Sequence, residues 1–245
     1  MRLTILGGHG TVPVAGGACS GYLLEHDGFR LWVDAGNGTL GKLQQHWPID
    51  SVDAVWISHA HADHCADLFP FFFNSYVTDR VVPVYSPTGV SQRLAHLVGD
   101  DSAEAWRRLL DWRTIDPGDE GEIGPWKVRG FGAQHSVPNT VLRMESAGKV
   151  LTYTGDTGPH PDLDTAARDA DLFLCEASWV DPSQVFKPIH LLASQAAEVA
   201  AKAAVDRLIL THVWSVNDPV RVRETASSAF DGPLDLAFEL EHIEV

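Results

Sequence analysis

The chain has 245 residues, of which 44% are hydrophobic and 21% charged, an ordinary composition for a globular protein. Its formal net charge of −15 argues against a long nucleic-acid footprint, because an acidic surface repels phosphate backbones. No run approaches the roughly 18 apolar residues that a membrane helix needs, and three scattered cysteines are too few for a disulfide framework. We expect a single domain over residues 1–245, no membrane partner and a cytoplasmic location.

Short apolar runs rich in β-forming residues recur along the chain between glycines and prolines. They predict strands at residues 3–6, 21–25, 30–34, 54–58, 81–85, 126–131, 140–145, 149–154, 172–175, 207–211 and 234–240. The clearest helices are expected at 193–204, which is rich in alanine, and at 219–230, which Asp218 would cap. Weaker helical patterns cover 39–46, 66–76, 89–98, 103–111 and 162–169.

Each half of the chain runs from strands into helices. This order predicts two sheets packed face to face, with helices covering their outer faces. The segment 99–124 has the most loop-like sequence, and we expect it to form a surface insertion near the pocket. The aromatic run 69–73 is expected to be core rather than a pocket wall or an interface.

One hexapeptide carries the strongest chemical signal. The run 54–58 leads into His59-Ala60-His61-Ala62-Asp63-His64. Alternate residues of an extended segment point to the same side, so His59 and His61 can reach one metal ion. Neutral imidazole and carboxylate groups suit zinc, with manganese and iron as alternatives. A solvated polar loop is the competing interpretation, but three histidines and an aspartate rarely fall within six residues by chance.

Further candidates follow other strand-like runs. His135 comes after 126–133, Asp156 after 149–154 and His212 after 207–211. Taken singly, each is more readily structural; together with the hexapeptide they indicate one site at an edge of the sheets. His190, just before the alanine-rich helix, is placed to offer a proton or a positive charge to a substrate.

The pattern from Ser58 to His64, followed in order by His135, Asp156 and His212, resembles the defining motifs of the metallo-β-lactamase fold. The resemblance covers nearly the whole chain, and it implies an αββα sandwich of two mostly antiparallel or mixed sheets flanked by helices. It implies two divalent metal ions, with the first held by His59, His61 and His135 and the second held by Asp63, His64 and His212. Asp156 would bridge the two ions. Asp34 and Ser58 are candidates to support the ligands, although a turn and a strand end explain them equally well.

The later motifs are similar to the ribonuclease Z-like branch of that family. They are 153–157, 175–178 and His190. The resemblance implies that Glu176 orients His190, which contacts the scissile phosphate or protonates the leaving oxygen. The branch usually has His-Ser-Thr where this chain has His190-Leu191-Leu192, so only the histidine carries over.

Two departures argue against processing of transfer RNA. Those nucleases carry a long arm before the bridging aspartate, whereas here the interval is 156 − 135 = 21 residues, enough only for a β-hairpin. The acidic charge also disfavours gripping RNA. The segments 171–179, 208–213 and 230–233 look instead like those of compact bacterial phosphodiesterases for cyclic nucleotides.

We therefore expect a two-metal phosphodiesterase that cleaves a small anionic phosphodiester, such as 3′,5′-cyclic AMP, with a metal-activated hydroxide. Asp63 and Asp156 would act in catalysis as well as in metal binding, alongside Glu176 and His190. The alternatives are a ribonuclease Z-like RNA 3′-end nuclease, a thioester or lactone hydrolase of the same fold, and a metal-binding protein without catalysis. Extended nucleic acid is an unlikely partner, and a homodimer is compatible with the sequence.

Overall fold

The computed structural model describes residues 1–185, 187–237 and 242–245. Within these residues the strands form two sheets. The first has the order β14-β1-β2-β3-β4-β5-β6. Its strands are β1 (Arg2–Gly7), β2 (Gly21–His26), β3 (Phe29–Ala35), β4 (Ala54–Trp56), β5 (Val82–Ser86), β6 (Leu110–Thr114) and β14 (His242–Glu244). Pairing is antiparallel from β14 to β3 and parallel from β3 to β6.

The second sheet has the order β13-β12-β11-β10-β9-β8-β7. Its strands are β7 (Glu120–Ile123), β8 (Trp126–Phe131), β9 (Val141–Ser146), β10 (Lys149–Tyr153), β11 (Leu172–Glu176), β12 (Leu208–Thr211) and β13 (Leu234–Leu236). Pairing is parallel from β13 to β10 and antiparallel from β10 to β7. Both sheets are therefore mixed, and each places the C-terminal ends of its parallel strands at one edge.

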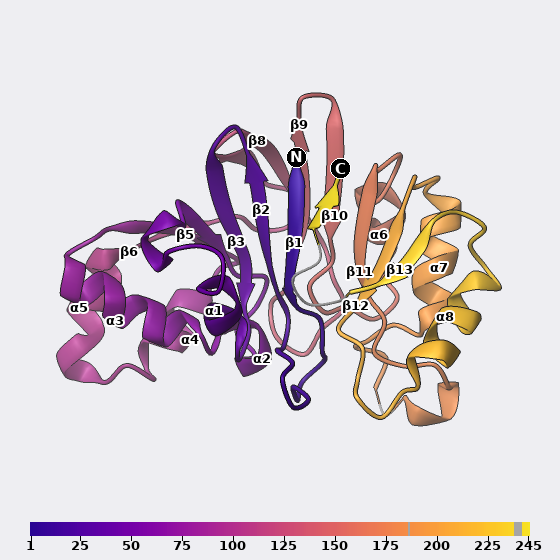
Figure 1. The fold of residues 1–245 in the computed structure, drawn as a ribbon, viewed down its shortest axis with the longest axis horizontal. Helices are drawn as coiled ribbons and strands as arrows, with labels where there is room; N and C mark the ends of the chain where they lie inside the picture. The colour runs from indigo at the N-terminus through magenta and orange to yellow at the C-terminus, as the bar shows by residue number, and fades with distance from the viewer. Residues whose placement is uncertain (186, 238–241) are drawn as a thin grey trace.

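Helices cover the outer face of each sheet, as Figure 1 shows. Beside the first sheet lie α1 (Thr39–Leu43), α3 (Leu68–Thr78), α4 (Val90–Ala95) and α5 (Ala103–Leu109); beside the second lie α6 (Asp162–Ala166), α7 (Ala193–Lys202) and α8 (Pro219–Ser227). The short α2 (Ala62–Cys65) lies at the lower edge of the sheets in Figure 1. Single 3₁₀ turns occur at Ile49–Ser51, Asp100–Ser102 and Pro182–Gln184. The αββα expectation is confirmed.

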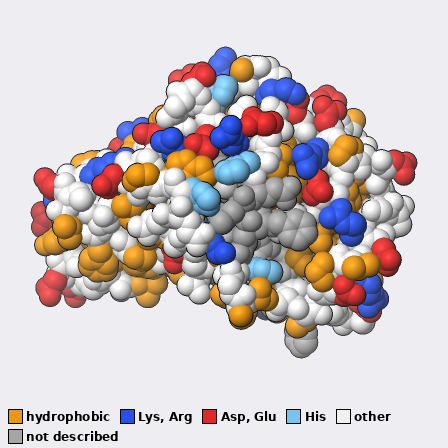
Figure 2. Space-filling model, in the orientation of Figure 1, with side chains coloured by type: hydrophobic (Ala, Val, Ile, Leu, Met, Phe, Trp, Pro, Cys, Tyr) orange, Lys and Arg blue, Asp and Glu red, His pale blue; other side chains and the backbone are white. Residues whose placement is uncertain are grey.

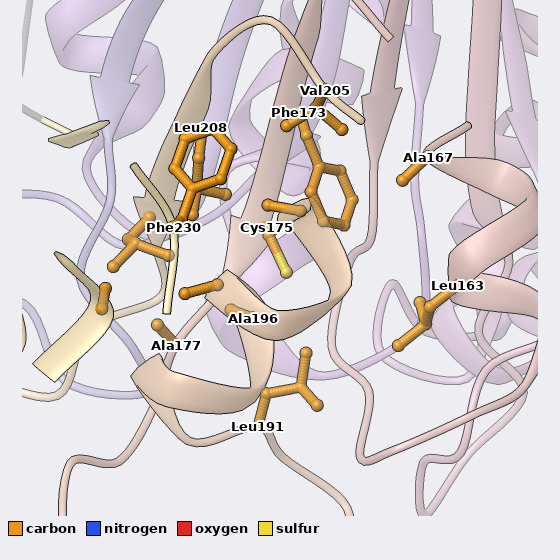
Figure 3. Packing of buried hydrophobic residues seen from close by; sticks show 14 of the residues in the cluster. Leu163, Ala167, Phe173, Cys175, Ala177, Leu191, Ala196, Val205, Leu208 and Phe230 are labelled. Atoms are coloured by element: carbon orange, nitrogen blue, oxygen red, sulfur yellow. The ribbon is translucent and has the colours of Figure 1, made fainter. Parts of the chain in front are cut away.

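Three apolar clusters hold these layers together. One lies between the sheets and contains Trp56, Trp126 and Tyr153. A second packs the first sheet against its helices, and there Phe71 and Phe72 of α3 are buried while Phe73 is 51% exposed. In the third, Phe173 and Cys175 of β11 pack with alanines of α7 (Figure 3), whose small side chains let helix and sheet approach closely.

Most predicted elements are confirmed with small shifts at their ends. The Asp218 side chain accepts a hydrogen bond from the Val220 amide and caps α8 as expected. The predicted strand 234–240 is seen as Leu234–Leu236, and residues 238–240 lie outside the described part of the chain. The expectation of a surface insertion at 99–124 is wrong. This segment forms α5 and the edge strands β6 and β7, whose charged and exposed residues gave little apolar signal.

Within the ranges that the structure describes, no helix is both long and apolar enough to cross a membrane.

Candidate metal centre

The loop after β4 presents the hexapeptide ligands at the shared edge of the two sheets. His59 and His64 are fully buried, and Asp63 and His64 lie in α2. Backbone contacts hold this turn: the Thr11 amide donates to Asp63 Oδ2 at 2.9 Å. A Cβ atom at Gly36 would lie 2.2 Å from the Asp63 carbonyl oxygen, so only glycine lets β3 approach α2 this closely.

The second sheet supplies the other candidates from three separate loops. His135 follows β8, Asp156 follows β10 and His212 follows β12. His212 has φ +52°, a left-handed conformation that is costly for a residue other than glycine. All seven predicted ligands therefore meet at one place.

Their side-chain nitrogens and oxygens fall into two groups. One is His59, His61, His135 and Asp156; the other is Asp63, His64, Asp156 and His212. Within each group the candidate ligand atoms lie within 4.8 Å of one another. Asp156 is common to both: its Oδ2 lies 3.6 Å from His59 Nε2 and 3.4 Å from His212 Nε2. This shared position is the one expected for a bridging carboxylate.

The donor set fits metal ions. His61 Nδ1 lies 3.1 Å from His59 Nε2 and 3.0 Å from His135 Nε2, so three ring nitrogens converge. His64 Nε2 and Asp156 Oδ1 are buried 3.2 Å apart, within ion-pair distance, and neither makes a hydrogen bond to another described group. A cation bound here would be held by both atoms. The residues form clusters able to bind metal ions.

Burial sets the charge state of the first group. It lowers the pKa of His59 well below its usual value, and the nearby His64 adds to the effect. Burial also lowers the pKa of His61 and His135. These rings are therefore neutral at physiological pH, which is the form that binds metal.

The second ligand group contains two carboxylates, those of Asp63 and Asp156, whereas the first contains only that of Asp156. Burial alone would raise the pKa of Asp156, but the electrostatic effect of the adjacent His212 and His64 outweighs it and holds that pKa well below the usual value. Burial would likewise lower the pKa of His64, but the carboxylates of Asp156 and Asp34 raise it well above normal. The carboxylates thus favour a positive charge at this position.

Asp34, at the end of β3, supports the ligands of the first sheet. It is fully buried and accepts hydrogen bonds from the Ser58 amide, the Ser58 hydroxyl, His64 Nδ1 and the Tyr153 hydroxyl, all within 2.7 Å. Because the Ser58 hydroxyl donates to Asp34, it accepts from His59 Nδ1 at 3.0 Å. Both His59 and His64 therefore keep Nε2 for the centre.

Glu176, at the end of β11, does the same in the second sheet. It is fully buried and accepts from the amides of Thr157 and Leu191, from His190 Nδ1 at 2.9 Å and from the Ser178 hydroxyl at 2.8 Å. The Ser178 hydroxyl in turn accepts from His212 Nδ1 at 2.9 Å. One carboxylate thus orients the candidate ligand His212 and the candidate proton donor His190.

His190 is placed beside both groups. Its ring stacks on His212 with centroids 5.3 Å apart, and its Nδ1 lies 4.0 Å from Asp156 Oδ2. Burial would lower its pKa, but the charge of Glu176 and the hydrogen bond to it raise the pKa to about 9. His190 is therefore protonated at neutral pH, and its Nε2 makes no hydrogen bond to the described residues.

Several supporting groups were missed in the sequence. The Ile189 carbonyl accepts from His135 Nδ1, Tyr153 reaches Asp34 from the other sheet, and Ser178 links Glu176 to His212. The signal for Ser178 was its position two residues after Glu176 in an extended segment; the other two contacts are made only by the fold.

The chain is similar in sequence and fold to known proteins. The family model described as beta-lactamase superfamily domain matches residues 29–213. An uncharacterised protein of Mycobacterium leprae is 34% identical over 100% of this chain and 89% of its own length. Ribonuclease Z of Methanopyrus kandleri is 29% identical, covering 93% of this chain and 92% of its own.

Among solved structures, the metallo-beta-lactamase fold protein YhfI from Bacillus subtilis matches with a TM-score of 0.91 and 25% identity, covering 100% of this chain and 99% of that one. With the matched family model and the clusters able to hold metal, these likenesses establish a metallo-hydrolase. The chain belongs to the metallo-β-lactamase superfamily, in its ribonuclease Z-like branch.

Proposed function

We propose that this protein is a two-metal phosphodiesterase that cleaves a small phosphodiester such as 3′,5′-cyclic AMP. The observation that carries the proposal is the pairing of His190 with the buried Glu176, set directly beside both ligand groups. A hydrolase of phosphodiesters needs a proton for its leaving oxygen, and this pair offers one. The seven residues grouped around Asp156 would hold the ions.

When bound, the divalent ions would lower the pKa of a water molecule and offset the charge of the substrate's oxygens. Residues of the protein would supply the proton for the leaving oxygen. Glu176 fixes the His190 ring through Nδ1, which leaves the Nε2 proton for the substrate. As water forms a bond to phosphorus it releases a proton to solvent, the P–O bond to the leaving oxygen breaks, and that oxygen takes the proton from Nε2. Glu176 stabilises the protonated ring by its charge.

A nuclease acting on RNA 3′ ends is the second candidate, and the likeness to ribonuclease Z favours it. Because of that likeness, the expectation that extended nucleic acid is an unlikely partner is not supported. Two observations favour the small substrate. Residues 136–156 form the β9–β10 hairpin and its flanking loops, without a long arm, and acidic and basic side chains are interspersed over the face in Figure 2.

A substrate panel tests the proposal. The protein is reloaded in turn with zinc, manganese and iron, and hydrolysis is measured with bis-p-nitrophenyl phosphate, 3′,5′-cyclic AMP, a precursor RNA with a 3′ trailer, thioesters and lactones. We expect both small phosphodiesters to be cleaved. Hydrolysis confined to thioesters or lactones would contradict the proposal, and cleavage of the RNA alone would favour the second candidate.

A further inference from the structure

The loop between β1 and β2, residues 10–17, projects beyond the lower edge of the sheets in Figure 1, next to α2. The Thr11 amide donates to Asp63 Oδ2 at 2.9 Å, so the start of this loop is fixed to a candidate ligand. Thr11 has φ +49°, a left-handed backbone that is costly for a residue other than glycine and that clusters at functional sites. A substrate bound at the second ligand group would therefore lie close to this loop.

The exposed side chains of this loop are largely apolar. Val12 is 61% exposed and Val14 is 40% exposed, and residues 10–17 include no charged side chain. The chain as a whole has a net charge of −15, so an anionic substrate is repelled by much of its surface. Next to the candidate metal centre, by contrast, the loop offers an uncharged surface that such a substrate can contact.

A second uncharged loop, residues 213–217, continues this surface. The Gly10 amide donates to the Val213 carbonyl, which joins the two loops. The Trp214 ring packs against Gly10, where a Cβ atom would lie 2.6 Å from it, and its centroid is 4.6 Å from that of Trp179. Both tryptophans are half-buried. We call the resulting surface the apolar rim, and it consists of Val12, Val14, Trp179, Trp214 and Val216, of which Val216 is 70% exposed.

The apolar rim lies on the side of the candidate proton donor. Asp63 Oδ2, which accepts from the Thr11 amide, is 3.2 Å from His212 Nε2, and the His212 ring stacks on the ring of His190. A leaving oxygen must come within hydrogen-bond distance of His190 to take its proton. The group attached to that oxygen would therefore extend towards the apolar rim.

We infer that the apolar rim is the binding subsite for the leaving group of the substrate, and that this group is an alcohol or phenol with an apolar or aryl body. The inference rests on the proposed function and deepens it by defining one of the two groups attached to the phosphate. The valines would bury aliphatic area against such a body, and the tryptophans would offer flat rings for stacking. Since no side chain of the rim is charged, a leaving group with a second anionic group would gain no ion pair from it.

The test compares two substrates that release the same p-nitrophenol. Bis-p-nitrophenyl phosphate carries an aryl group on both sides of the phosphate, whereas methyl p-nitrophenyl phosphate carries one only on the leaving side. The serine double variant, Val12→Ser with Val14→Ser, should raise KM about 10-fold for both substrates, because the leaving group loses apolar contact, and should change kcat little. A rise in KM for bis-p-nitrophenyl phosphate alone would place the loop on the other side of the phosphate and overturn the inference.

Val77→Ser with Val81→Ser is the matched control. These valines are 83% and 52% exposed near the C-terminal end of α3 and the start of β5, at the end of that strand opposite the candidate ligands, so KM should not change. Val12→Ile with Val14→Ile keeps the apolar character and should retain the original KM. Each variant is brought to full metal loading before the kinetics, because Val12 follows the residue whose amide is bonded to Asp63.

Binding of phenylphosphonate and methylphosphonate tests the apolar rim without hydrolysis. Calorimetry on the metal-loaded protein should show about 10-fold tighter binding of phenylphosphonate, and the serine double variant should remove this difference. Equal affinity for the two ligands, or a difference that survives in the double variant, overturns the inference. If the difference is found and lost as expected but no phosphodiester is cleaved, the proposed function alone is rejected. If phosphodiesters are cleaved with a KM that the double variant leaves unchanged, the apolar rim alone is rejected.

Discussion

Asp34 in the first sheet and Glu176 in the second hold equivalent places in the site. Each is fully buried at the C-terminal end of a strand, and each orients one ring directly and a second ring through a serine hydroxyl: His64 and, through Ser58, His59 for Asp34; His190 and, through Ser178, His212 for Glu176. The difference lies in what they orient. Asp34 serves two candidate ligands, whereas Glu176 serves one ligand and the candidate proton donor.

Asp34 would therefore support metal binding alone, whereas Glu176 would support both metal binding and proton transfer. The first half of the chain supplies candidate ligands from one continuous turn. The second half also supplies candidate ligands, and it adds the candidate proton donor His190. Substitutions in the two halves should therefore have different kinetic signatures, and Asp156, which belongs to both ligand groups, should combine them.

The largest effect is expected for Asp156→Asn. Since Asp156 is shared by both groups, the substitution should lower the content of both ions and reduce activity at least about 1,000-fold, more than the 10- to 100-fold typical of residues that only support a ligand. Metal content by elemental analysis and hydrolysis of bis-p-nitrophenyl phosphate measure the two effects. Loss of a single ion with the other retained would show that the halves do not share this carboxylate.

His190→Ala should distinguish proton donation from metal binding most clearly. The ligand groups remain, so metal content should be unchanged, while kcat falls about 100- to 10,000-fold because the leaving oxygen lacks a proton donor. His160→Ala is a matched control, because His160 lies outside both ligand groups. Unchanged turnover of a substrate with a poor leaving group would exclude His190 as the donor.

Asp34→Asn and Glu176→Gln test the two carboxylates directly. Asp34→Asn should weaken metal affinity about 10- to 100-fold and leave kcat nearly intact at saturating metal. Glu176→Gln should also lower kcat at saturating metal, since the His190 ring loses its charged partner. Metal titrations with activity as the readout distinguish the two variants. If excess metal restored the kcat of both variants equally, Asp34 and Glu176 would not differ in role.

Ser58→Ala and Ser178→Ala form a matched pair with smaller effects. Each removes a hydroxyl that joins a ligand ring to a carboxylate, so each should weaken metal affinity about 10-fold. The threonine variants, which retain the hydroxyl, should recover most of the loss. Failure of threonine to recover affinity at either position would mean that the serine acts through packing alone.

The smallest effect is expected at the cap of α8, outside the site. Asp218→Ala should lower the free energy of unfolding by about 1 kcal/mol, because the Val220 amide loses its partner. Chemical denaturation measures this change. Metal content and turnover should not change, and a loss of either would show that α8 contributes to the second half of the site.

Local patterns explain what could be predicted from the sequence. The hexapeptide from His59 to His64 is contiguous, so its chemistry was readable before any fold was known. His135, Asp156 and His212 are far apart and became candidates through their positions after strand-like runs. Tyr153 and the Ile189 carbonyl could not be predicted, because their contacts with Asp34 and His135 depend on how the two sheets face each other. The edge strands β6 and β7 were missed because their exposed residues lack the apolar alternation of a half-buried strand.

The most direct test of the account is a metal titration of chelator-treated protein, followed by the rate of bis-p-nitrophenyl phosphate hydrolysis. If two ions share Asp156 and act with His190, the rate should rise from near zero and level off at two equivalents of bound metal per chain. Full hydrolysis without added metal, or no hydrolysis at any metal loading, would contradict the central claim.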